Sequence, residues 1–153
     1  MRRSDKELTD PAAIEDILKR ARICHIALCD DGKPYVVPMN YGYDGNCLYL
    51  HSAREGRKID IIKRNNLVAF SIFIDDMPVE NDIACKRTMK YRSIMGQGSI
   101  TLIGHAGEKE KALQIIMSHQ AGEGDYQFER ARVEKVIVLR VDIEEMSGKK
   151  SGY

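Results

Sequence analysis

Residues 23–43 read ICHIALCDDGKPYVVPMNYGY, two apolar segments separated by the short polar turn DDG at residues 30–32. The apolar and β-branched side chains of residues 23–29 favour a strand, and Asp-Gly is a common two-residue hairpin turn. A second turn, YDGN, leads into CLYLH at residues 47–51. The sequence therefore predicts three strands joined by two tight turns, an antiparallel meander.

The rest of the chain adds helices on either side of further strands. Apolar residues at helical spacing predict a helix that begins after Asp10, with Pro11 at its first position, and another at residues 108–119. Three later segments have the length and branching of strands: residues 67–74, 89–103 and 134–146. Residues 75–87 are polar and predict a loop, and Gly96 and Gly98 predict a bulge or bend.

Composition limits the classes of protein to consider. A chain of 153 residues with few helices and several antiparallel strands predicts one α+β domain, residues 1–153, with a barrel-like sheet. No apolar run approaches ~20 residues, and the start lacks a secretory signal, so we expect no membrane partner and a cytoplasmic location. A net charge of +1 argues against a nucleic-acid partner. The four cysteines lack C-x-x-C spacing and are interpreted as small core residues.

Residues 48–58, LYLHSAREGRK, change from a strand pattern to a basic polar one. Ser52 and Glu55 have the S-x-x-E spacing of a capping box, which predicts a helix starting at Ser52. Gly56 would let a ligand approach the first turn of that helix. Three cations surround the same turn: Arg54, Arg57 and Lys58. These features predict a phosphate site at a strand-to-helix turn, the alternative being the solvated face of a surface helix.

Two further groups of residues are candidates for a site. His51 ends a predicted strand and is either a hydrogen-bonded structural residue or a proton donor. The spacing of the histidines predicts no metal site, and no P-loop or G-x-G-x-x-G motif occurs. Pro38 predicts an edge strand or bulge, and the run Pro38-Met39-Asn40-Tyr41 could contact a flat heteroaromatic ligand. The alternative is a bulged core strand with a buried tyrosine.

The order and spacing of DGKPYVVPMNY, LYLHSAREGRK and YRSIMGQG resemble the pyridoxamine 5′-phosphate oxidase-like split-barrel flavoproteins, most of all their nitroimidazole-resistance (Nim-type) subgroup. The resemblance covers residues 23–149 and implies a six-stranded antiparallel split β-barrel with flanking helices. It also implies a homodimer with FMN at the subunit interface. The residues that it implies as cofactor-binding are Pro38, Met39, Asn40, Tyr41, His51, Ser52, Ala53, Gly56, Arg57, Lys58, Tyr91 and Ser93.

The same resemblance implies an FMN-dependent oxidoreductase that reduces small acceptors such as nitroaromatics, with His51 as the catalytic candidate. FAD is a possible cofactor if its adenylate projects into solvent. The chain has no tryptophan and lacks the R-L-x-P-type ending of true pyridoxamine phosphate oxidases, so the resemblance does not carry over the vitamin substrate. The alternative function is a flavin or haem binding or sensing protein without turnover.

Overall fold

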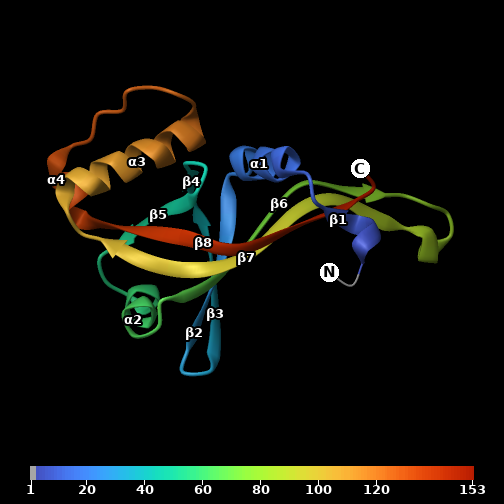
Figure 1. The fold of residues 1–153 in the computed structure, drawn as a ribbon, viewed down its shortest axis with the longest axis horizontal. Coiled ribbons are helices and arrows are strands. Elements are labelled where there is room, and N and C mark those ends of the chain that lie inside the picture. Colours follow the sequence, from blue (N-terminus) through green and yellow to red (C-terminus); the bar gives the residue numbers. More distant parts are fainter. Residues whose placement is uncertain (1–2) are drawn as a thin grey trace.

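The computed structural model describes residues 3–153 as one curved antiparallel sheet with helices packed on it (Figure 1). The strand order is β3-β2-β6-β7-β8-β5-β4, and β1 pairs with β8. The six long strands are β2 (Ile23–Asp30), β3 (Lys33–Asn40), β5 (Cys47–Ala53), β6 (Leu67–Val79), β7 (Thr88–Ile103) and β8 (Val136–Ser151). Two strands have two residues each: β1 (Glu7–Leu8) and β4 (Gly42–Tyr43). The helices are α1 (Pro11–Arg20), α2 (Arg57–Arg64), α3 (Ala106–Ala121) and α4 (Arg130–Lys135), with short 3-10 turns at Ser4–Lys6 and Ala84–Lys86.

The first predicted hairpin is confirmed. Asp31 and Gly32 connect β2 to β3 with φ values of 51° and 77°, the pair of positive angles that a tight hairpin turn needs. β3 pairs only with β2, so it is an edge strand. Pro38 therefore lies where a residue without an N–H donor is tolerated, as the sequence predicts.

The second predicted turn is confirmed, because residues 44–46 connect β4 to β5 and Tyr43 pairs with Leu48, but the predicted meander of three neighbouring strands is wrong. β5 pairs with β8 along its whole length, and it pairs with β4 but not with β3. The chain leaves the first hairpin at Tyr41, and Gly42 then lies directly under α3: a Cβ on Gly42 would come within 2.7 Å of the Ile116 backbone. Gly42 and the next residue form β4, which pairs with β5 rather than with β2, so the chain changes partner strand at this close contact with α3.

The polar segment that begins at Asp75 is predicted to be a loop, but its first residues continue strand β6. β6 continues to Val79 and pairs with β7 in a long hairpin, with a register shift between Ile74 and Met77. Asp75 has a φ of 56°, so one strained residue absorbs the irregularity and pairing resumes beyond it. The loop predicted from residue 75 is therefore wrong in its first half.

The bulge predicted around the two glycines of β7 is confirmed. The register of β7 against β8 shifts between Gln97 and Gly98. A Cβ on Gly98 would lie 1.9 Å from the Asp142 carbonyl oxygen, so only glycine fits this close approach of two strands.

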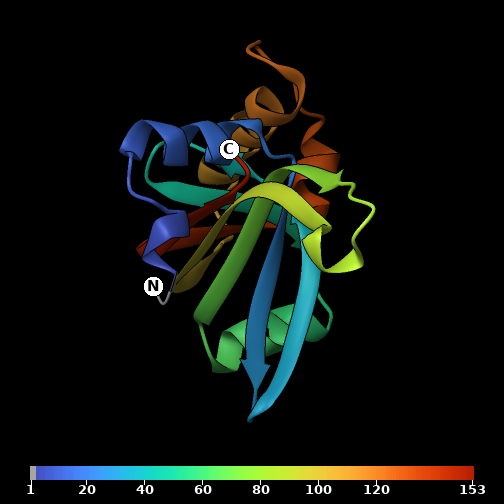
Figure 2. The ribbon, with the colours of Figure 1, turned by 90° about the vertical axis from the view of Figure 1, so that its right-hand side faces the viewer.

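The core lies inside the curve of the sheet. α1 packs on β6 and β7, α2 on β2, and α3 on β4, β5 and β8. Figure 2 shows β6, β2 and β3 side by side with α2 across one end of them. Cys24 is fully buried, and burial raises the pKa of its thiol to about 12. Cys29 and Cys85 are exposed, so the prediction of core cysteines is wrong for these two. Within residues 3–153, no helix is both long enough and apolar enough to cross a membrane.

Candidate functional site

Ser52, at the end of β5, and Lys58, in the first turn of α2, are in contact. The Lys58 ammonium donates to Ser52 Oγ at 3.0 Å, and Ser52 is only 7% exposed. Among residues 3–153, no carboxylate oxygen lies within 4.0 Å of the Lys58 ammonium. Because an ammonium has three donors, Lys58 keeps donors for a further partner beside the Ser52 hydroxyl.

α2 starts at Arg57, so the predicted start at Ser52 is wrong. Ser52 remains in β5 because that strand pairs with β8 as far as Ala53. Gly56 is the N-cap, and its φ of 119° is a conformation that side-chain-bearing residues rarely adopt. No side chain caps this helix, and a Cβ on Gly56 would meet no atom within 4 Å. The Ile59 N–H donates to the Gly56 carbonyl oxygen at 2.9 Å, whereas within the described residues the N–H groups of Arg57 and Lys58 have no acceptor, an arrangement that favours anions.

The two arginines predicted to flank the phosphate site are held elsewhere. The Arg57 guanidinium lies 4.7 Å from the centre of the Tyr35 ring and 4.0 Å from the Asp30 carboxylate. Arg54 donates to the Glu134 carbonyl oxygen at 3.4 Å, toward α4. Of the three cations, Lys58 alone contacts Ser52. The Arg57 contacts could not be predicted from local sequence, because they depend on the β2–β3 hairpin lying against α2.

The four candidates on β3 and just beyond it do not present their side chains to one ligand. Pro38 and Asn40 are exposed, whereas Met39 packs against the core. Tyr41 is fully buried and its hydroxyl donates to the Leu18 carbonyl oxygen at 2.6 Å. Burial raises the pKa of the Tyr41 phenol. The prediction of a ring contact from Tyr41 is therefore wrong and the tyrosine is buried as in the alternative, but β3 pairs with β2 without the bulge that the alternative also expected.

His51 and Ala53 are exposed and leave β5 on the face opposite to Ser52. Beyond Tyr49, the edge of β5 that faces away from β8 is not paired by β4. Within the described chain, the His51 ring makes no hydrogen bond to protein. The end of β5 thus offers unpaired backbone groups, with a free imidazole on one face and Ser52 on the other.

Tyr91 and Ser93 lie far from this cluster in the same chain. On β8, Ser52 is opposite Ile137, whereas Ser93 is opposite Lys149. The twelve positions between those two residues of β8 correspond to roughly 40 Å of strand. In Figure 1, α2 lies at the left and the β6–β7 hairpin extends to the right. One chain therefore does not bring all the predicted residues together.

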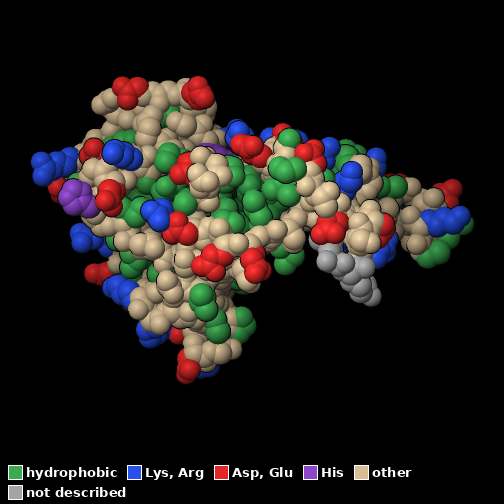
Figure 3. Space-filling model, viewed as in Figure 1, with side chains coloured by type: hydrophobic (Ala, Val, Ile, Leu, Met, Phe, Trp, Pro, Cys, Tyr) green, Lys and Arg blue, Asp and Glu red, His purple; other side chains and the backbone are tan. Residues whose placement is uncertain are grey.

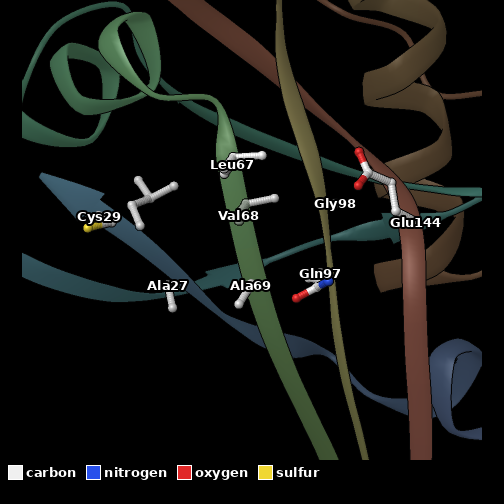
Figure 4. A pocket seen from close by; sticks show the side chains of 9 residues that line it. Ala27, Cys29, Leu67, Val68, Ala69, Gln97, Gly98 and Glu144 are labelled. Atoms are coloured by element: carbon white, nitrogen blue, oxygen red, sulfur yellow. The ribbon is translucent and has the colours of Figure 1, made fainter. Parts of the chain in front are cut away.

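The outer face of the sheet carries an open apolar surface. By strand register, five large exposed side chains lie on this face: Ile23, Val36, Leu67, Phe73 and Met95. A shallow cavity of about 380 Å³ opens between β2, β6 and β7, where Figure 4 shows Ala27, Ala69 and Gln97 at its surface. In Figure 3, hydrophobic side chains also gather below α3 and α1, over the middle of β8. Apolar surface on this scale is typical of an interface. The alternating side chains of residues 34–40 indicate a strand with two different faces. The sequence does not show which of the two faces remains exposed to solvent.

Comparison with known proteins places this geometry in a family. Residues 10–150 match the family model described as pyridoxamine 5′-phosphate oxidase. A solved protein of Bacteroides thetaiotaomicron VPI-5482, whose suggested role is 5-nitroimidazole antibiotic resistance, is 36% identical, with a TM-score of 0.83 over 94% of this chain and 86% of that one. The FAD and haem binding protein of Mycobacterium smegmatis shares the fold, with a TM-score of 0.86 at 21% identity over 97% of this chain and 74% of its own.

An uncharacterised curated protein of Rhizobium meliloti (strain 1021) is 34% identical over 58 residues. That match spans 38% of this chain and 38% of the relative. The family match and the B. thetaiotaomicron relative both cover most of the chain. The described sheet is the split barrel that the resemblance implies, with two short strands, β1 and β4, in addition to the six expected. The chain is similar to a solved protein whose suggested role is 5-nitroimidazole antibiotic resistance, and it belongs to the pyridoxamine 5′-phosphate oxidase family.

Proposed function

We propose that this protein binds FMN between two copies of the chain and acts as an oxidoreductase that reduces small acceptors such as nitroaromatics. The observation that carries the proposal is the contact between Ser52 and Lys58 at the uncapped start of α2. A hydroxyl, an ammonium and free helix N–H groups are the groups that bind phosphate in proteins.

The residues present fit a phosphate ester. Lys58 supplies positive charge that no neighbouring carboxylate neutralises, and Ser52 supplies a hydroxyl beside it. The open space over Gly56 leaves room for phosphate oxygens to approach the backbone of the first helical turn. Arg57 lies one residue away, and its position against Tyr35 and Asp30 suits it to support the helix rather than to bind phosphate directly.

A second copy of the chain would complete the site. Tyr91 and Ser93 lie too far along the sheet to act with Lys58 of their own chain, so we propose that they contact the flavin bound by the other copy. A dimer that uses the open face of the sheet would also cover the apolar side chains described above, and ligand sites occur preferentially at such interfaces.

A bound flavin supplies electron transfer, and the protein supplies binding, orientation and hydrogen bonds. We propose that Lys58 and Ser52 hold the phosphate, while the free edge of β5 and the exposed Pro38 and Asn40 border the ring system. His51, exposed at the end of β5, is the proposed site of proton exchange because an imidazole can both donate and accept a proton.

The relatives support the proposal and define its alternatives. The B. thetaiotaomicron relative suggests nitroimidazoles as acceptors. The M. smegmatis relative, which binds FAD and haem, makes FAD in place of FMN, or binding without turnover, the competing function. NAD(P)H-driven bleaching with turnover of a nitroaromatic would separate an enzyme from a binding protein.

The visible spectrum of the purified protein, before and after dithionite, tests the cofactor. We expect a yellow protein whose flavin bands bleach on reduction and whose extracted pigment is FMN. A sharp haem band would support the binding alternative. A protein that stays colourless after incubation with FMN and FAD would contradict the proposal.

A further inference from the structure

A second basic cavity lies beneath α3 and α4, apart from the Ser52–Lys58 cluster. Its volume is about 470 Å³, and its walls include Lys109, Arg54, Arg130 and the first residues of α3, Ala106 and Gly107. It contains none of Ser52, Gly56 or Lys58. Any ligand of this cavity is therefore distinct from one held at the start of α2.

Lys109 is the unusual residue of this cavity. It is 5% exposed, yet within residues 3–153 its ammonium has no hydrogen-bond acceptor and no carboxylate within 4.0 Å. No fully buried side-chain nitrogen or oxygen in the described chain lacks a partner. The Lys109 ammonium must therefore keep a small exposed area, and the cavity that Lys109 lines provides it. The stem of Lys109 is buried and its ammonium reaches the cavity without a counter-charge within 4.0 Å in the described chain, so a bound anion would make a favourable charge-assisted contact there.

The start of α3 adds hydrogen-bond donors on the same wall. His105 is the N-cap and makes no capping bond through its side chain, so the N–H groups of Ala106 and Gly107 lack a partner in the helix. Both residues line the cavity, and a Cβ on Gly107 would meet no atom within 4 Å. The positive end of a sixteen-residue helix thus faces the same space as Lys109.

The remaining charges of the cavity leave it net positive. Arg130 is paired with the Glu134 carboxylate at 3.1 Å. Arg54 contacts only the Glu134 carbonyl oxygen, which does not neutralise it. Glu110 is the other carboxylate of the wall. Lys109 and Arg54 therefore leave an excess of positive charge beside the free N–H groups of α3.

We propose that this cavity binds a phosphate group, free or carried on a small organic molecule, through Lys109, Arg54 and the N–H groups of Ala106 and Gly107. The three cations and two carboxylates of the wall leave a net charge of +1, which favours an anion such as phosphate, and the volume leaves room for an organic part, since small-molecule sites begin at about 300 Å³. This site uses other residues than the proposed flavin site and adjoins it through Arg54, which lies between Ser52 and Gly56 in the sequence.

The test is a titration with inorganic phosphate, and in parallel with ribose 5-phosphate, followed by the amide NMR signals of Ala106 and Gly107. The protein carries Lys58→Met, so that phosphate at the start of α2 does not contribute. We expect both amide signals to shift and saturate. Lys109→Met, which keeps the apolar stem, should weaken binding at least about tenfold. Tighter binding of ribose 5-phosphate would identify a phosphorylated metabolite, and equal binding would identify free phosphate.

Lys111→Met is the matched control, because Lys111 is exposed on the same helix and does not line this cavity. It should leave the titration unchanged. If Lys109→Met does not fold, Lys109→Gln serves the same purpose. Amide signals that do not move, or that move equally in the Lys109 variant, would overturn the proposal. Flavin absorbance is also measured on Lys109→Met in a protein that keeps the natural Lys58. This measurement separates a failure of the cavity proposal from a failure of the flavin proposal.

Discussion

The Lys58 ammonium lies 3.0 Å from Ser52 Oγ and so joins the end of β5 to the first turn of α2. The spacing of Ser52 and Glu55 predicts that Ser52 caps the helix. Ser52 contacts the Lys58 ammonium instead. The helix start is left open above Gly56. This relationship makes Lys58 the residue on which the proposed phosphate site depends.

Lys58→Met should weaken FMN binding at least about tenfold, because it removes the charge-assisted bonds to phosphate and keeps most of the side-chain volume. Arg57→Ala should have a smaller effect on FMN and should lower the free energy of unfolding by about 0.5–1 kcal/mol, through loss of the contact with Tyr35. Flavin fluorescence titration and chemical denaturation measure the two quantities. Equal losses of FMN affinity in both variants would show that Arg57 also binds the phosphate.

A mixed dimer tests whether two chains share one flavin site. In a dimer made of one variant alone, we expect Lys58→Met and Tyr91→Ala each to reduce the amount of bound FMN. In a dimer containing one copy of each variant, one site would combine the natural Lys58 with the natural Tyr91. The tandem-purified mixed dimer should then bind about half as much FMN as the natural protein. Light scattering on the natural protein should give the mass of two chains.

If both residues acted within one chain, every site of the mixed dimer would carry a defect and binding would stay low. A stable monomer with flavin bound would equally contradict the shared site. The control is a mixed dimer of Lys58→Met and Lys111→Met. In this dimer the Lys111→Met chain keeps all of its proposed flavin-binding residues.

His51→Ala should separate binding from turnover. The imidazole leaves β5 on the face opposite to Ser52, so its loss should not disturb the Ser52–Lys58 contact, and the yellow colour should persist. If His51 exchanges a proton during reduction, turnover of the acceptor should fall while bound-flavin absorbance is unchanged. Unchanged turnover would remove the catalytic role and leave the phosphate site standing.

His119 should make stability depend on pH. Burial lowers the pKa of its imidazole from 6.5, aided by the Arg22 charge and opposed by the hydrogen bond to the Ala21 carbonyl. The unfolded chain therefore takes up this proton first as pH falls, and stability should decrease below about pH 6.5 until the lower folded pKa is reached. Denaturation of His119→Gln between pH 7 and 5 should show a shallower dependence. His105→Gln is the control for loss of an exposed histidine. An unchanged slope in His119→Gln would contradict the assignment.

Local chemistry made some of the fold predictable. The turn at Asp31 and Gly32 needs residues that tolerate positive φ, and the cap at Asp10 needs a short acceptor, which bonds the Ala12 N–H at 3.0 Å. Both requirements are satisfied by residues adjacent in sequence. The bulge at Gly98 was likewise predictable, because a glycine inside a strand usually marks a close approach of backbone.

Long-range packing determined the rest. The S-x-x-E pattern favoured a helix at Ser52, but pairing with β8, far along the chain, keeps that residue extended. Tyr41 offered an aromatic ring of the kind that contacts a flat ligand. The ring is buried instead, and its hydroxyl donates to the carbonyl oxygen of Leu18, which is distant in the sequence. The separation of Tyr91 from Lys58 follows only from the strand register, which no local pattern contains.

We propose that Ser52, Lys58 and the start of α2 bind the phosphate of a flavin. The most direct measurement is a parallel titration of the apoprotein and of its Lys58→Met variant with FMN and with riboflavin. We predict that the natural protein binds FMN at least about tenfold more tightly than riboflavin, and that the variant loses most of this preference. Equal affinities for the two flavins in the natural protein, or an undiminished preference for FMN in the variant, would contradict the claim.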